Sequence, residues 1–222
     1  MAAWVRSGKM SGLLITFEGT EGSGKSTQIE LLAKRLRAGH RVVRLLREPG
    51  GTPIGEEIRH TLKHSAANRA MTAEAELLLM NASRAQLVRE VIRPALAAGD
   101  IVLCDRFYDS TTAYQGYGRG LDLKLVKAVI DFAVSETRPT LTFLLHVPIQ
   151  VSESRRQSRQ TAGETQRDRM EEADRGFFER VEQGYKAIAD AEPKRVRWID
   201  ATQSIELISE AIWQHVKQML VP

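Results

Sequence analysis

The segment at 19–26 constrains the fold of this chain more than any other feature. Its sequence, GTEGSGKS, matches the pattern G-x-x-x-x-G-K-[ST] in full, between an apolar run at 13–17 and an apolar stripe with helical spacing at 28–36. In such a strand–loop–helix unit, glycines let backbone N–H groups point at phosphate oxygens, and the helix N-terminus adds partial positive charge. The sequence therefore predicts a phosphate-binding loop in which Lys25 reaches the β- and γ-phosphates and Ser26 helps to bind Mg²⁺.

Strands and helices are expected to alternate along the rest of the chain. Helical stripes lie at about 72–98, 121–132 and 205–219. Further short apolar runs, typical of buried strands, lie at 41–46, 101–104, 141–147 and 196–199. The alternation predicts an α/β fold with a parallel five-stranded sheet covered by helices on both faces. No inter-domain linker is recognisable, so a tail of residues 1–10 and a single domain at 11–222 are expected.

One segment, at about 155–169, differs from the rest because it has five arginines and no apolar period. We interpret it as a mobile flap on the surface rather than as part of the core.

Composition excludes several classes of protein. The single cysteine, Cys104, rules out a disulfide framework and a multi-cysteine zinc site. No apolar run reaches the ~18 residues of a membrane span, and the first is shorter than the roughly 7–15 residues of a secretory signal, so a cytoplasmic protein is expected. The net charge of +4 is too small for a nucleic-acid footprint unless the charge is clustered.

Polar residues follow the apolar run at 101–104. Ligands bind at the carboxyl ends of strands in parallel sheets, so Asp105 and Arg106 are expected to face the phosphates. Asp105 can hold Mg²⁺ there. The segment at 110–116 adds hydroxyls, an amide and an aromatic ring, which suit a sugar and a base edge but also suit a plain polar loop.

An arginine interrupts the apolar face of the helix expected at 72–98. That face is apolar except at Asn81 and Arg84. Either Arg84 extends to water from the edge of the core, or it is paired and lines a pocket for a planar, hydrogen-bonding ligand. The pattern alone leaves both interpretations open.

Four blocks of the sequence resemble bacterial thymidylate (dTMP) kinases: FEGTEGSGKST at 17–27, REPGGT at 47–52, DRF at 105–107 and AYQGYGRG at 113–120. The first block is shared by many phosphate-binding proteins, whereas REPGGT and AYQG are far more specific to the family. The resemblance implies a three-layer P-loop NTPase-type fold with a lid. It also implies the reaction ATP + dTMP → ADP + dTDP with Mg²⁺, which serves dTTP synthesis, and a homodimer.

The resemblance also implies roles for individual residues. Lys25, Arg106 and Glu21 would be catalytic, together with Arg169 of the flap, which resembles the family's lid. The other flap arginines, including Arg155, are expected to be solvated or weakly steering. Met80 stands where many members have a phenylalanine that stacks on the base. ATP would be held by Gly19, Thr20, Glu21, Gly22, Ser23, Gly24, Lys25, Ser26 and Thr27. The dTMP would be held by Glu48, Pro49, Arg59, Met80, Arg84, Arg106, Thr111, Tyr114 and Gln115.

Other functions stay open from the residues alone. A related kinase could act on another nucleotide or on a deoxynucleoside. A nucleotide-dependent switch or ATPase would need no small acceptor and would hydrolyse ATP alone. A nucleic-acid role for the flap is disfavoured by the acids among its arginines, Glu164, Asp168, Glu171 and Glu172.

Overall fold

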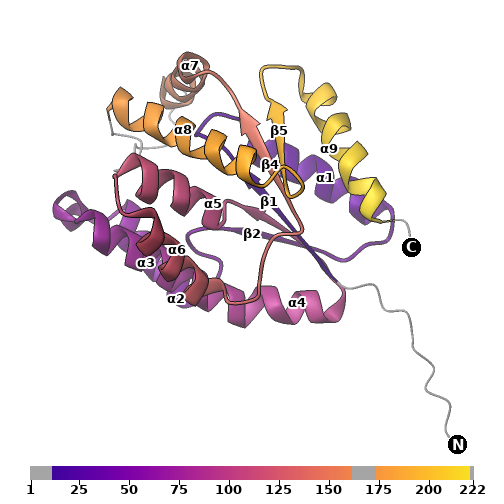
Figure 1. The fold of residues 1–222 in the computed structure, drawn as a ribbon. Coiled ribbons are helices and arrows are strands. Elements are labelled where there is room, and N and C mark those ends of the chain that lie inside the picture. Colours follow the sequence, from indigo (N-terminus) through magenta and orange to yellow (C-terminus); the bar gives the residue numbers. More distant parts are fainter. Residues whose placement is uncertain (1–11, 162–173, 221–222) are drawn as a thin grey trace, which may run out of the picture.

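The computed structural model describes residues 12–161 and 174–220, which are arranged around a parallel five-stranded sheet (Figure 1). The strand order is β2-β3-β1-β4-β5, and every neighbouring pair is parallel. The strands are β1 (Leu13–Glu18), β2 (Val43–Arg47), β3 (Ile101–Asp105), β4 (Leu141–His146) and β5 (Val196–Asp200). Each corresponds to an apolar run in the sequence, so the predicted α/β fold is confirmed.

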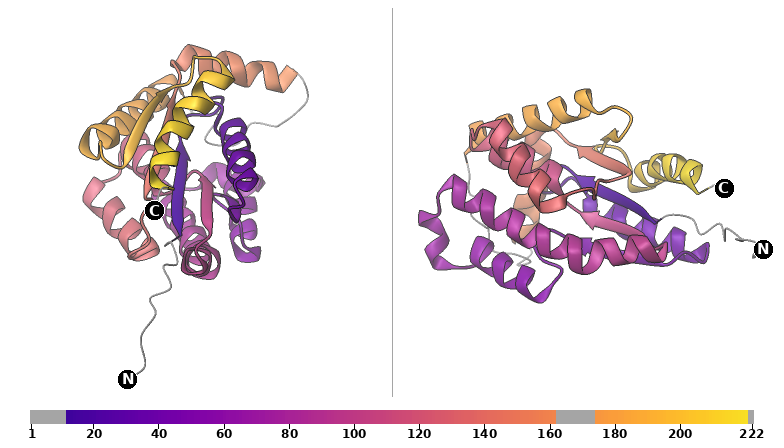
Figure 2. Two further views of the ribbon diagram at one scale, coloured as in Figure 1. Left: turned by 90° about the vertical axis from the view of Figure 1, so that its right-hand side faces the viewer. Right: turned by 60° about the horizontal axis from the view of Figure 1, so that its bottom comes forward.

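Helices cover both faces of the sheet because alternate strand residues are apolar on both sides (Figure 2). Ile15 and Phe17 of β1 belong to one core cluster, with α1 (Lys25–Ala38) and α9 (Ile205–Met219). Leu14 belongs to a second cluster, on the other face, with α3 (Ala73–Leu87) and α6 (Leu123–Val134). Cys104 is buried in this second cluster, as a small apolar residue.

The long helix expected at 72–98 contains an irregular turn. Thr72 caps its start by accepting a hydrogen bond from the Ala75 N–H. After α3 come a π-helical turn, η2 (Val88–Ile92), and a short helix, α4 (Arg93–Ala98). Pro94 lies in the first turn of α4 and has no N–H to donate to the preceding turn, which explains why the regular hydrogen-bond pattern breaks just before it.

Several helices were not expected from apolar periodicity. They are α2 (Pro53–Lys63), the 3₁₀ helix η1 (Ala66–Ala70), α5 (Tyr108–Thr111) with the π-helical η3 (Thr112–Gly118), α7 (Ile149–Thr161) and α8 (Arg175–Ala191). Residues 155–161 of the expected flap are helical and form the C-terminal part of α7. The polar sequence of α7 concealed the helix, because a helix with few apolar residues leaves no stripe. Residues 1–10 and 162–169, including Arg169, lie outside the described residues.

Within residues 12–161 and 174–220, no helix combines the length and the apolar character that crossing a membrane requires.

Candidate active site

The loop between β1 and α1 has the backbone shape that its glycines predict. Gly19, Gly22 and Gly24 have φ angles of 128°, 79° and 91°, which residues that carry a Cβ atom rarely adopt. A Cβ on Gly19 would lie 2.2 Å from the carbonyl oxygen of Leu145 in the neighbouring strand. The close approach of loop and sheet therefore requires glycine at this position.

Lys25, the first residue of α1, folds back over this loop. Its Nζ donates to the carbonyl oxygens of Gly19 at 3.0 Å and Thr20 at 2.9 Å. Burial, reinforced by the positive charge of Arg106, lowers the pKa of Lys25 to about 8. An ammonium group held in this way at a helix N-terminus can bind an anion.

A cleft opens in front of the loop. It is lined by the loop from Glu21 to Thr27 and by cationic residues from other elements: Arg47, Arg59, Lys63, Arg106 and Arg155. The hydroxyl of Ser23 is buried in the loop without a hydrogen-bond partner among the described residues. An unpartnered buried donor next to clustered positive charge suits the oxygens of a phosphate chain.

Ser26 and Asp105 meet at one side of the cleft, as the sequence predicts. The Ser26 hydroxyl donates to Oδ2 of Asp105 at 3.0 Å, which joins the start of α1 to the end of β3. A hydroxyl and a carboxylate are hard oxygen ligands of the kind Mg²⁺ prefers.

Arg106 lies at the centre of the site. Its Nη2 donates to Oε1 of Glu21 and to the Tyr114 hydroxyl. The guanidinium carbon also lies over the Tyr114 ring, 5.1 Å from the ring centroid. Burial alone would raise the pKa of Glu21, but the charges of Arg106 and Lys25 lower it to about 2. Burial would also lower the pKa of Arg106, but Glu21 and nearby phenol oxygens raise it well above its ordinary value. Both groups are therefore charged at neutral pH.

A second pocket lies beside the phosphate cleft and occupies about 440 Å³, its open mouth included. It shares Glu21, Glu48, Lys63 and Arg106 with the cleft, so the two sites meet at a charged junction. The rest of its lining is Pro49, Met80, Arg84, Phe107, Ser110, Thr111, Tyr114 and Gln115.

Arg84 is buried in the wall of this second pocket, so the interpretation that it extends to water is wrong. Its side chain is 2% exposed and forms an ion pair with Glu48, with Nε 2.8 Å from Oε2. It also donates to Oδ1 of Asn81 and to the Phe107 carbonyl oxygen. The two polar residues that interrupt the apolar face of α3 therefore bind each other.

Other residues of the second pocket are held from behind. The Gln115 amide donates to Glu76 at 2.8 Å, and Glu76 also pairs with Arg119. Arg59, which lines the phosphate cleft, donates to the Pro49 carbonyl oxygen at 2.8 Å. Anchors of this kind orient side chains before a ligand binds.

Comparison with known proteins bears directly on this pair of sites. A family model described as thymidylate kinase matches residues 17–212. The chain belongs to the thymidylate kinase family. The thymidylate kinase of Alcanivorax borkumensis is 45% identical over 95% of this chain and 98% of its own length. That of Geobacter sulfurreducens is 48% identical over 90% and 94%. The crystal structure of thymidylate kinase from Ehrlichia chaffeensis aligns with a TM-score of 0.74 and 33% identity, covering 93% of this chain and 99% of that one.

Two of the residues that the resemblance to thymidylate kinases implies for ATP binding lie behind the phosphate cleft and not in its lining. Gly19 and Thr20 do not line the phosphate cleft; their carbonyl oxygens hold Lys25 instead. Arg169 lies outside the described residues. The other implied residues line one pocket or the other.

Three residues near the junction were missed or misread from the sequence. Lys63 lines both pockets, and its spacing of four from Arg59 on α2 could have revealed it. Tyr185 of α8 hydrogen-bonds Arg106 at 3.2 Å. Arg155, expected to be solvated, donates to the Gly22 carbonyl oxygen at 3.1 Å and to that of Ala201 at 3.2 Å, and so joins the loop to the segment after β5.

Proposed function

We propose that this chain transfers the γ-phosphoryl group of ATP to dTMP, with Mg²⁺ as cofactor and in the cytoplasm. The observation that carries the proposal is the junction of the two pockets at Glu21, Lys63 and Arg106. Direct transfer between two substrates requires their reacting atoms to meet at one place from which water can be excluded. A phosphate cleft that opens into a separate small-molecule pocket supplies that arrangement.

The proposed chemistry needs no covalent intermediate. An oxygen of the acceptor phosphate attacks the γ-phosphorus, and the bond to the β-phosphate oxygen breaks on the opposite side. The protein contributes position and positive charge. Lys25 and the loop N–H groups hold the donor phosphates, and Arg106 lies at the junction where charge develops in the transition state.

Ser26 and Asp105 fit the proposed Mg²⁺. Among the described residues, no cluster of three or more His, Cys, Asp or Glu side chains could hold a metal ion alone. This agrees with Mg²⁺ chemistry, because that ion is usually held by one or two protein oxygens together with substrate phosphates. Bound there, Mg²⁺ supplies positive charge to the phosphate oxygens.

The second pocket is the proposed dTMP site. Arg84, Thr111 and Gln115 supply polar groups for the base, and Met80 and Phe107 supply apolar surface. By resemblance to the family, Tyr114 crowds the 2′ position and favours deoxyribose. Glu48, Pro49 and Arg59 are proposed to surround the sugar and phosphate of the acceptor.

The proposal is tested by coupled measurement of ADP release across a panel of nucleoside monophosphates and deoxynucleosides. We expect kcat/KM to be highest for dTMP and ADP release to require an acceptor. A higher kcat/KM for another acceptor would show that this acceptor, and not dTMP, is the substrate. Rapid ATP hydrolysis without any acceptor would favour a switch or ATPase and overturn the proposal.

We expect Arg84→Ala to weaken both folding and dTMP binding. Removing the guanidinium leaves the Glu48 carboxylate buried without its ion pair, and its Oε1 already has no partner among the described residues. The loss of unfolding free energy is expected to be about 3–5 kcal/mol. Denaturant unfolding measures this loss, and calorimetric titration measures the affinities for dTMP and ATP.

The double variant Arg84→Ala/Glu48→Gln separates the two effects. Removing both charges should restore part of the stability but not the dTMP affinity. Normal dTMP affinity in the folded fraction of Arg84→Ala would show that Arg84 has a structural role only.

We expect Lys63→Met to raise KM for dTMP by about tenfold, equivalent to ~1.4 kcal/mol. The lysine lies at the end of α2, lines both pockets, and its charge contributes to the low pKa of Glu21. Steady-state kinetics measure the change, with Lys186→Met, an exposed lysine on α8, as the matched control. An unchanged KM in a folded Lys63→Met protein would remove Lys63 from the acceptor site.

The lid at about 155–169 is proposed to supply a further catalytic arginine, Arg169, by resemblance to the family. The phosphate loop itself has glycine at position 22, so within the loop only Lys25 carries positive charge. We expect Arg169→Ala to lower kcat by about 10²-fold or more with a much smaller change in dTMP affinity. Arg167→Ala is the control; if it proves the more damaged variant, the residue assignment is wrong.

A homodimer is also proposed, with no nucleic acid or membrane as partner. Three large apolar side chains are exposed on the adjacent helices α3 and α6: Leu78 is 59% exposed, Leu125 52% and Phe132 82%. Exposed apolar side chains of this kind suit burial against a second copy of the chain. Light scattering should give twice the chain mass, and Phe132→Glu should give a monomer.

A further inference from the structure

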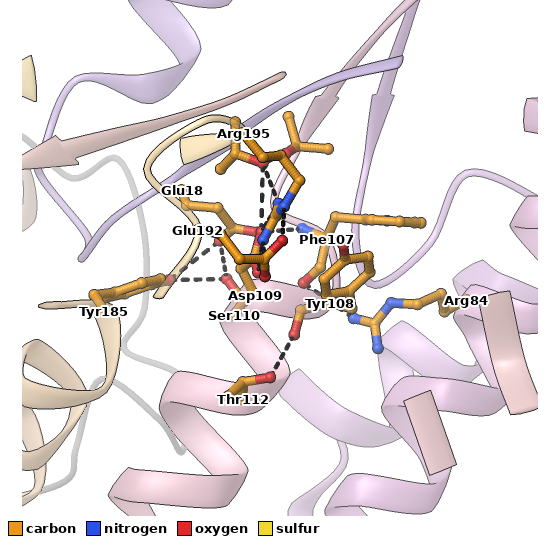
Figure 3. A network of polar contacts seen from close by, with 12 residues as sticks. Glu18, Arg84, Phe107, Tyr108, Asp109, Ser110, Thr112, Tyr185, Glu192 and Arg195 are labelled. Carbon is orange, nitrogen blue, oxygen red and sulfur yellow. Dashed lines mark hydrogen bonds and ion pairs between the residues drawn. The ribbon is translucent and has the colours of Figure 1, made fainter. Parts of the chain in front are cut away.

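Glu18 is a buried carboxylate that lines none of the pockets described above. It is the last residue of β1, its side chain is fully buried, and it accepts hydrogen bonds from three residues of other parts of the fold (Figure 3). Oε1 accepts from the Phe107 N–H at 2.8 Å. Oε2 accepts from the Ser110 hydroxyl at 2.5 Å and from the Tyr185 hydroxyl at 3.2 Å. Burying a carboxylate is costly unless it is hydrogen-bonded, and these three bonds offset that cost.

The hydroxyl groups of Ser110 and Tyr185, which donate to Glu18, also accept hydrogen bonds from Arg106. Nη1 of Arg106 donates to the Ser110 oxygen at 2.9 Å and to the Tyr185 oxygen at 3.2 Å. An ionised carboxylate only accepts, and each hydroxyl has a single hydrogen to donate. The Ser110 hydrogen points at Glu18, and that of Tyr185 points at Glu18 or at the Ser110 oxygen 2.9 Å away. In either case both hydroxyl oxygens present lone pairs to the guanidinium.

The backbone at Arg106 depends on Glu18 as well. Arg106 has a φ angle of 68°, a left-handed conformation that is uncommon for residues other than glycine. Its own N–H donates to the Phe17 carbonyl oxygen at 2.9 Å, and the next N–H, that of Phe107, donates to Glu18. Consecutive N–H groups on either side of the strained residue are therefore tied to the end of β1.

We propose that Glu18 is a positioning residue that sets the guanidinium of Arg106 at the junction of the two pockets, through Ser110, Tyr185 and the Phe107 peptide. The inference rests on the proposed function, in which Arg106 acts on the transferred phosphoryl group. Glu18 itself lines neither substrate pocket, so its effect on the reaction is indirect. The proposal assigns that effect to Arg106.

The charges around Glu18 give the proposal a pH dependence. Burial and the neighbouring Asp109 raise the pKa of Glu18 to about 7, against the opposing effects of Ser110, Arg106 and the Phe107 N–H. Asp109 is itself held by two hydrogen bonds from Arg195, at 2.7 and 2.9 Å (Figure 3). The charge of Lys25 also interacts with that of Glu18.

The sign of this dependence follows from the raised pKa. Above that pKa Glu18 is an acceptor only, as the three hydrogen bonds require. As pH falls through about 7, the carboxyl gains a proton and becomes a donor toward one hydroxyl. That hydroxyl must then turn its hydrogen elsewhere, including toward Arg106, so kcat is expected to fall on the acid side.

The test is a double-mutant cycle between Glu18→Gln and Arg106→Lys, assayed about one pH unit above the pKa of Glu18. Glutamine keeps the shape of Glu18 but places an amide donor against the hydroxyl groups. We expect Glu18→Gln to lower kcat by about 10- to 100-fold with less than about threefold change in either KM. In the Arg106→Lys background, the same change should cost less than about twofold.

Two further variants separate positioning from folding. Tyr185→Phe keeps the buried ring and removes one acceptor of Nη1, and should lower kcat by about three- to tenfold, again not additively with Arg106→Lys. Asp109→Asn removes a buried carboxylate that is bonded to Arg195 and not to Arg106. It should lower the melting temperature while its effect on kcat is small and additive with Arg106→Lys.

The outcomes are distinct. Equal losses from Glu18→Gln in both backgrounds, or a lower melting temperature with unchanged kcat, would overturn the positioning role. An acid limb of kcat that is unchanged in Glu18→Gln would also contradict it. Failure of the proposed function would appear earlier, as a wild-type protein without dTMP-dependent ADP release.

Discussion

Lys25→Ala is expected to lower kcat by about 10³-fold or more while leaving the fold intact. The ammonium group is fixed over the phosphate loop by the carbonyl oxygens of Gly19 and Thr20. There it can follow the charge that moves from the γ-phosphoryl group to the leaving β-phosphate oxygen. An uncharged methyl group at this position offers no substitute, and the cationic residues across the cleft come from other elements and meet the phosphates from other sides.

The measurement is single-turnover transfer at saturating ATP and dTMP, together with a thermal melt. Lys34→Ala is the matched control, because Lys34 is an exposed lysine on the same helix. Its turnover and melting temperature should match those of the wild type. Near wild-type turnover in a folded Lys25→Ala protein would contradict the phosphate-loop interpretation itself.

The strands were predictable because strands of a parallel sheet are buried on both faces. Residues 101–104 are an uninterrupted apolar run, and 141–147 is apolar except at Thr142 and His146; both form interior strands of the sheet. Their carboxyl ends then placed Asp105 and Arg106 correctly at the phosphate cleft. The position of the strand, together with the rule that ligands bind at the carboxyl ends of parallel strands, was enough to predict this part of the site.

The helices show where periodicity fails. In α7 the sequence IQVSESRRQSRQT has too few apolar residues to mark a face. In α8 the signal existed, since Phe177, Val181 and Tyr185 are spaced by four and all are buried. Helix α8 therefore has a recognisable apolar stripe in its sequence, whereas α7 has none.

The polar network was beyond sequence reasoning for a geometric reason. Glu18 and Tyr185 are 167 positions apart and meet only because α8 packs behind the end of β1. Arg84 gives the same lesson, because spacing left two interpretations open and its partner Glu48, 36 positions away, decides between them. Local spacing identifies which residues are unusual, but tertiary contacts determine their partners.

Arg106→Ala is expected to lower kcat by about 10³-fold, within the ~10³–10⁵ that a donated arginine contributes in comparable phosphoryl transfers. The guanidinium lies between Glu21 and Tyr114 at the junction of the two pockets, and it has donors to offer an oxygen from either side. Its raised pKa keeps it charged at neutral pH. The loss of kcat should be largest above the pKa of Glu18, about 7, and smaller below it, where protonated Glu18 no longer positions the guanidinium.

Arg106→Lys should recover only part of this loss. Lysine keeps the charge but lacks the planar fork that reaches Glu21 and Tyr114 with one nitrogen and Ser110 and Tyr185 with the other. The effect on folding should be smaller than that of Arg84→Ala. Glu21 is 19% exposed and retains some hydration when its partner is removed, whereas Glu48 is almost fully buried.

Single-turnover rates and calorimetric dTMP affinity together decide what Arg106 does. An interaction formed mainly in the transition state lowers kcat with little change in the affinity for dTMP. If Arg106→Ala instead weakened dTMP binding while kcat at saturating dTMP stayed normal, Arg106 would be a binding residue only. Glu18 would then hold a substrate contact in place, and its own variants should raise KM rather than lower kcat.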